Sequence, residues 1–313
     1  MSPICWCCAY NVETSLACLF CCCPWQCEKQ SARESAKRVS VYKKSGLGCW
    51  VDAKQAPFSP RFLLDLQDPK YKLQVWDGAS LTVSELRRRL LGDIRKFSSA
   101  DYPGFVKERE ADGITYERNP SLENNGNAFF RLTGDLKIPA DLAVAMLADA
   151  QKIGFKEWGL ATVQFFHTFP DEQSFMVYTI APPGGPIAWR DYVDFSGWAR
   201  EADGTLVQGT LSCCSAEVPT FPGAVRGTNL IFGYEFKPKE GGGSVQATLV
   251  AQTETGGCLP KCLSNSFFTI FLTLYLKELE QTGLDMIKAG TAAKFVSQFP
   301  GLGPLNLPEE FRG

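Results

Sequence analysis

The chain has 313 residues, of which 45% are hydrophobic and 12% aromatic, enough to bury one large core and a smaller accessory segment. Its 32 basic and 34 acidic side chains give a net charge of −2, which provides no broad attraction to a phosphate backbone and disfavours nucleic acid as a partner. No stretch approaches the roughly 18 apolar residues of a membrane-spanning helix, and the longest candidate is residues 267–276.

The N-terminal segment, residues 1–27, is rich in cysteine, and a basic arm with six basic and two acidic side chains follows it at residues 28–46. The segment lacks the basic start and the cleavage site of a secretory signal peptide, so we expect a cytoplasmic protein. Adjacent cysteines and the lack of histidine make a poor zinc pattern, and disulfides suit secreted proteins. S-acylation fits better, because apolar residues and a basic arm accompany the thiols. A metal cluster, or no defined role, is the alternative. The candidates for acylation are Cys5, Cys7, Cys8, Cys18, Cys21, Cys22, Cys23 and Cys27.

The folded part is expected to begin with a helix over residues 81–97, which Thr82 or Ser84 can cap. The alternation of apolar and polar residues, broken by turn-forming segments, predicts a long series of antiparallel strands. A second helix, over residues 139–153, interrupts them, and a very apolar helix over residues 259–281 ends the series. The predicted strands are residues 113–119, 127–138, 161–169, 173–181, 190–200, 205–214, 227–236 and 244–254.

Three short motifs follow one another in the second half of the chain. They are Arg-Asp-Tyr-Val at 190–193, Pro-x-x-x-Gly-x-Val-Arg at 219–226 and Gly-x-x-Pro-Lys at 257–261. With Trp158, which follows the second predicted helix, this combination resembles the START (steroidogenic acute regulatory protein-related lipid transfer) family over about residues 80–282. The resemblance implies an α+β helix-grip fold, in which a curved antiparallel β-sheet wraps around a long C-terminal helix and encloses a hydrophobic tunnel.

The resemblance also implies that loops beside the last helix close the tunnel and meet membranes. The loop between residues 214 and 227 is unusually apolar, and Val218 and Phe221 are the candidates for such a gate. An ordinary loop that packs on the core would have the same composition. A stripe along the last helix is the candidate for one wall of the tunnel, although core packing alone would also produce it.

Many family members carry a buried acidic and basic pair in the tunnel, and the equivalent positions here are Val177 and Ser196, which cannot carry charge. Alternation along residues 190–200 puts Asp194 on the same strand face as Ser196. If that face is inward, Asp194 is the polar anchor for a cationic or hydroxylated head group; a register shift of one residue would expose it instead. Arg190 is expected to be structural, near a strand end. The lipid-binding candidates are Val177, Thr179, Tyr192, Asp194, Ser196, Trp198, Val218, Phe221, Phe232, Phe267, Ile270, Phe271 and Leu274.

The sequence predicts a non-catalytic protein that binds one lipid (a sterol, phospholipid or sphingolipid) and transfers or senses it at a membrane surface, with peripheral membrane association in the cytoplasm. The alternatives are a membrane-tethered START-like scaffold without lipid exchange and, less favoured, an enzyme of the same fold that uses the one histidine, His167. No catalytic residue, metal site or cofactor is predicted. The expected organisation is the cysteine-rich head, a connector over residues 28–80, a lipid-binding domain over residues 81–282 and a tail over residues 283–313.

Overall fold

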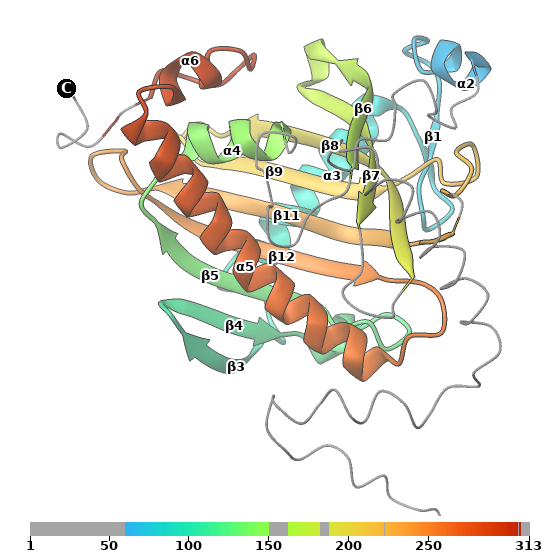
Figure 1. The fold of residues 1–313 in the computed structure, drawn as a ribbon, viewed down its shortest axis with the longest axis horizontal. Helices are drawn as coiled ribbons and strands as arrows, with labels where there is room; N and C mark the ends of the chain where they lie inside the picture. The colour runs from blue at the N-terminus through green and yellow to red at the C-terminus, as the bar shows by residue number, and fades with distance from the viewer. Residues whose placement is uncertain (1–59, 150–161, 182–187, 222, 306, 308–313) are drawn as a thin grey trace, which may run out of the picture.

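A large antiparallel sheet dominates the computed structural model, which describes residues 60–149, 162–181, 188–221, 223–305 and 307 (Figure 1). Within these residues the strand order is β3-β4-β5-β12-β11-β9-β8-β7-β6, and β10 pairs in parallel with β8. The strands of this sheet are β3 (Val106–Ala111), β4 (Ile114–Arg118), β5 (Phe130–Leu136), β6 (Thr162–Phe169), β7 (Ser174–Ala181), β8 (Trp189–Arg200), β9 (Leu206–Ser212), β10 (Ala224–Arg226), β11 (Thr228–Pro238) and β12 (Val245–Glu254).

One face of the sheet, here called the outer face, packs against helix α3 (Val83–Ser98). Thr82 and Glu85 form a capping box at the start of α3, as the sequence predicted for Thr82, and buried leucine and isoleucine side chains of the helix face the sheet. Glycines in the strands let the helix approach closely: a Cβ on Gly233 would lie 2.5 Å from Ile94 Cδ1. Helix α2 (Pro60–Asp65) and the small β1 (Leu73–Gln74) and β2 (Ser80–Leu81) pair extend the apolar cluster on this face.

The opposite face, here called the inner face, is covered by α4 (Ala140–Ala148), α5 (Lys261–Lys288) and α6 (Ala292–Val296) (Figure 1). Helix α5 crosses the strands diagonally and buries Leu272, Leu276 and Leu279 against them. Helix α4 is short and alanine-rich, so it packs directly on β8, β9 and β11. The protein therefore has two apolar layers, one on each side of the sheet.

The predicted antiparallel sheet and long C-terminal helix are confirmed, and most predicted strands lie within two or three residues of those observed. The prediction omitted β3, whose sequence is VKEREA, because its charged side chains gave no apolar alternation. It also omitted the three-residue β10 and the short α6. The expected domain end at residue 282 lies inside α5, which continues to Lys288. The expectations for the cysteine-rich head, the basic arm and Trp158 lie outside the described residues.

Helix α5 has 28 residues but also carries several charged side chains. Neither α5 nor any other helix in the described part of the chain has the length and apolar content needed to cross a membrane.

Candidate functional site

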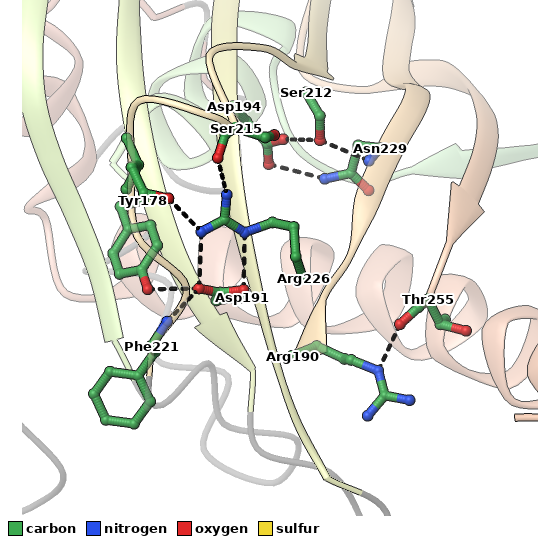
Figure 2. A network of polar contacts seen from close by, with 11 residues as sticks. Tyr178, Arg190, Asp191, Asp194, Ser212, Ser215, Phe221, Arg226, Asn229 and Thr255 are labelled. Carbon is green, nitrogen blue, oxygen red and sulfur yellow. Dashed lines mark hydrogen bonds and ion pairs between the residues drawn. The ribbon is translucent and has the colours of Figure 1, made fainter. Parts of the chain in front are cut away.

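Successive side chains of strand β8 point to opposite faces of the sheet. Its first two charged residues, Arg190 and Asp191, therefore hold different loops. Arg190 is buried, and its guanidinium donates to the carbonyl oxygens of Thr255, at 2.6 Å, and Gly256, at 3.4 Å, which precede α5 (Figure 2). This arrangement agrees with the structural role expected for Arg190. It fixes the segment that connects β12 to α5.

Asp191 points to the outer face and forms the centre of a second clasp (Figure 2). Its carboxylate, which is fully buried, accepts from Arg226 Nε at 2.9 Å and Arg226 Nη2 at 3.1 Å, from the Tyr178 hydroxyl at 2.7 Å and from the Phe221 backbone at 2.7 Å. Arg226 also donates to the carbonyl oxygen of Val218. The Arg-Asp and Val-Arg motifs thus meet in one buried ion pair that fixes the apolar loop.

The structure places this loop differently from the predicted gate. Val218 is only 1% exposed and packs in the outer-face cluster with α3, so its apolar character is explained by core packing. Phe221 is half-buried, and its ring lies 6.4 Å from that of Trp189. The alternative stated for this loop, ordinary packing on the core, describes Val218, and Phe221 is the more accessible of the two.

A row of hydrogen-bonded polar side chains crosses four neighbouring strands on the inner face. Asp194 Oδ1 accepts from the Ser212 hydroxyl at 2.6 Å, and Asp194 Oδ2 accepts from Asn229 Nδ2 at 2.9 Å (Figure 2). Asn229 Oδ1 in turn accepts from the Thr253 hydroxyl at 2.8 Å. Asp194 lies opposite Val177, which packs in the inner-face cluster, so of the two registers considered for Asp194 the inward one is observed.

Asp194 is an uncompensated buried carboxylate. It is 2% exposed, and its hydrogen-bond partners within the described residues are neutral. Burial raises its pKa from 3.8 to about 6, although the hydrogen bonds from Ser212 and Asn229 and the more distant charge of Arg226 oppose this shift. A carboxylate held in this way costs stability, and such groups gather at binding and catalytic sites.

Two further polar rows continue along the inner face from Asp194. Ser196 and Thr210 are opposite each other, and their hydroxyls lie 3.1 Å apart. Trp198, Gln208 and Tyr234 form the next row across β8, β9 and β11. Gln208 Nε2 donates to Ser196 Oγ at 3.0 Å, so the two rows are connected.

The remaining sheet candidates also lie near these rows. Val177 is buried, and Thr179 and Tyr192, which pair with each other one step further along β7 and β8, are half-buried. Phe232 is half-buried against the inner-face cluster, and its ring lies 5.8 Å from that of Tyr275 on α5.

Only some of the lipid-binding candidates on α5 face the inner side of the sheet. Phe271 packs against the inner-face cluster, whereas Ile270 is 44% exposed and lies on the other side of α5, away from the sheet. Leu274 is half-buried, and nothing is described for the side chain of Phe267. The observed sheet-facing residues are Phe268, Phe271, Leu272, Tyr275, Leu276 and Leu279. The predicted stripe was rotated because α5 is apolar nearly all round.

Sequence reasoning missed Gln208, Ser212, Asn229 and Thr253. The available signal was the alternation in β9, Leu-Val-Gln-Gly-Thr-Leu-Ser, where the polar Gln208, Thr210 and Ser212 alternate with Gly209 and Leu211. Such alternation ordinarily indicates a solvent-facing side. Here the polar side is the buried one, which a single strand cannot reveal.

His167 lies away from the polar rows. It pairs with Met176, which packs in the outer-face cluster, and its ring lies 4.5 Å from that of Phe169. Burial lowers the pKa of His167. It therefore cannot join Asp194 in a shared site without a rearrangement of the sheet.

Comparison with known proteins agrees with this architecture. Residues 161–283 match the family model described as START domain. A stretch of 142 residues is 26% identical to an uncharacterized protein of Pseudomonas aeruginosa and covers 45% of this chain and 69% of that protein. The family match confirms the resemblance that the three motifs indicated.

Two human proteins of known structure share the fold. Human STARD10 superposes with a TM-score of 0.58 at 17% identity, over 70% of this chain and 89% of that chain. The human StAR-related lipid transfer protein 5 gives a TM-score of 0.56 at 20% identity, over 65% of this chain and 97% of that chain. These likenesses confirm the helix-grip α+β architecture.

Proposed function

We propose that this chain, which carries a START domain over residues 161–283, binds a single lipid between the inner face of its sheet and helix α5 and transfers or senses it at membranes. The observation that carries the proposal is Asp194, a buried carboxylate without an ion-pair partner among the described residues, in a row of neutral polar side chains beside the apolar inner-face cluster. A lipid offers both an apolar body for the layer and a polar group for the carboxylate.

Tyr192 and Tyr275 support this position for the ligand. Part of each side chain is accessible, yet each phenol lies deep enough in the protein that burial raises its pKa. Accessible surface within the interior is what a bound lipid would cover. Burial contributes about 0.8 kcal/mol per methylene, so a chain of ~16 carbons would gain on the order of 10 kcal/mol before ordering costs.

These residues favour the binding of a lipid without catalysis. Within the described residues, the three polar rows of the inner face carry hydroxyls, amides and the carboxylate of Asp194, whereas His167 lies on the other side of the sheet. Asp194 is the proposed anchor for a cationic or hydroxylated head group, and the half-buried Phe221 is the remaining candidate for contact with a membrane.

A lipid-transfer assay between donor and acceptor vesicles tests the proposal. Fluorescent phosphatidylcholine and a fluorescent sterol are followed with the wild type, with Thr210→Trp and with Ile270→Trp. Thr210 is half-buried on the inner face, so the added indole should fill the ligand's place and abolish transfer. Ile270 lies on the exposed side of α5, and its variant should transfer like the wild type. Equal transfer by both variants, or none by the wild type, would contradict the proposal and favour the scaffold.

We also propose that the cysteine-rich head, residues 1–27, anchors the protein to membranes through S-acylation. The eight cysteines and the basic arm that follows supply the two signals that stable anchoring requires. Replacement of all eight head cysteines by serine should release the protein from the membrane fraction of cells. Replacement of the exposed Cys258 and Cys262 is the matched control and should leave membrane association unchanged. Equal release by both variants would refute the assignment to the head.

A further inference from the structure

The row formed by Trp198, Gln208 and Tyr234 has a property that the Asp194 row lacks. Each of its three side chains carries a buried polar atom that has no hydrogen-bond partner among the described residues: Trp198 Nε1, Gln208 Oε1 and the Tyr234 hydroxyl. The side chains are 6%, 4% and 0% exposed. A buried polar atom without a partner lowers the stability of the folded protein by on the order of 1–3 kcal/mol. Three such atoms in one row therefore indicate that another molecule supplies their hydrogen bonds.

The three side chains are direct neighbours. Gln208 pairs with Trp198 of β8 on one side and with Tyr234 of β11 on the other. Cross-strand partners on one face have Cβ atoms roughly 5 Å apart, so the side chains of Trp198 and Tyr234 flank that of Gln208. Helix α4 packs over these same strands, β8, β9 and β11, and Tyr275 of α5 stacks on Tyr234 at 6.4 Å.

Turning the Gln208 amide over does not give its unpartnered atom a hydrogen bond. Its nitrogen already donates to Ser196 Oγ at 3.0 Å and lies 3.4 Å from Thr210 Oγ1. If the amide turned over, its nitrogen would take the place of the unpartnered oxygen. One polar atom of Gln208 therefore faces the row in either orientation.

We propose that this row, Trp198–Gln208–Tyr234, is the subsite for a neutral hydroxyl group of the bound lipid, which deepens the proposed function and rests on it. A hydroxyl has one donor and two acceptor sites. It can donate to Gln208 Oε1 while it accepts from Trp198 Nε1 and from the Tyr234 hydroxyl, so each unpartnered atom gains one bond. In the observed orientation of the amide, an ester carbonyl or an ether has no donor for Gln208 Oε1, and a carboxylate or ammonium group would be buried there without a counter-charge.

The subsite is distinct from Asp194. The two lie four residues apart on β8, about 13 Å along the strand, and the hydrogen bonds of the Asp194 row do not include Trp198, Gln208 or Tyr234. A ligand that engages both would carry a polar group near each end of a rigid or extended apolar segment.

The test is an uptake experiment with lipids whose hydroxyl is either free or blocked. Full-length protein is incubated with phosphatidylcholine vesicles that contain cholesterol and 1,2-dioleoylglycerol, or the O-methyl ethers of both, and the retained lipids are extracted and measured by mass spectrometry. The wild type should prefer at least one free hydroxyl over its methyl ether by roughly tenfold, the effect expected from its buried hydrogen bonds. Trp198→Phe, Gln208→Leu and Tyr234→Phe should each lower this ratio towards one.

Tyr116→Phe is the matched control, because it removes a buried phenol of the same layer whose hydroxyl lies 2.7 Å from Thr273 Oγ1. It should leave the ratio unchanged. If all variants keep the wild-type ratio, or if the wild type retains only phosphatidylcholine, the row holds a buried water or nothing and the subsite is refuted while lipid binding stands. If the wild type retains no lipid at all, the proposed function fails together with the subsite.

Discussion

Asp194→Asn should stabilise the lipid-free protein at neutral pH and remove part of its pH dependence. The pKa of Asp194 is raised from 3.8 to about 6, so between these values the folded protein holds a proton that the unfolded chain has released. The free energy of unfolding therefore falls as the pH rises through this window, and the loss is complete above about pH 6. Two pKa units correspond to about 3 kcal/mol.

The asparagine can retain the hydrogen bonds of the row. If the Asn229 amide turns over, its oxygen can accept from the new amide nitrogen while its own nitrogen donates to Thr253. The variant should then exceed the wild type in the free energy of unfolding by up to about 3 kcal/mol at pH 7.5, with little or no gain at pH 4.

Urea unfolding of lipid-free protein, followed by circular dichroism from pH 4 to pH 8, measures this difference. Asp135→Asn is the control, because Asp135 is an exposed carboxylate on β5 that contacts Lys239. The difference between Asp194→Asn and the wild type should grow between pH 4 and pH 6 and then level off. Parallel curves for these two proteins would show that Asp194 is not the strained carboxylate described above.

Four other substitutions test the packing. Arg226→Met leaves Asp191 buried without its cationic partner and should cost about 3–5 kcal/mol in urea unfolding; a loss under ~1 kcal/mol would show that the clasp is not structural. Gly233→Ala puts a Cβ 2.5 Å from a side chain of α3 and from a backbone oxygen, so the melting temperature should fall sharply, whereas an unchanged value would contradict the close packing of α3. Leu272→Ala should cost about 2–5 kcal/mol and Ile270→Ala under ~1 kcal/mol; similar losses would mean that the sheet-facing side of α5 is assigned wrongly.

The sequence predicts the order of strands and helices well because the strands alternate regularly and α3 has a capping box. It also places Asp194, Ser196 and Trp198 correctly on one face, since alternation along a single strand is enough for that. The family motifs contribute in another way: the structure shows that Asp191 and Arg226, from two of the motifs, form a buried ion pair that holds the apolar loop.

The candidate site is harder to predict than the fold because it depends on which strands become neighbours. Gln208 and Tyr234 are 26 positions apart in the numbering and come together only through the β9–β11 register. The face of α5 was mispredicted because a helix that is apolar on nearly every side gives no clear stripe. For Val218 the sequence leaves a gate and ordinary core packing open, because apolar loop residues have the same composition whether they are accessible or buried under another element.

Native mass spectrometry of the purified protein, combined with lipid extraction, tests the central claim most directly. The full chain is compared with a form that lacks residues 1–45, so that the binding of lipid is separated from the anchoring of the head. We expect one lipid molecule per chain, of one class, retained by both forms. If neither form carries a lipid after incubation with mixed vesicles, the inner face is a closed core and the protein is a scaffold.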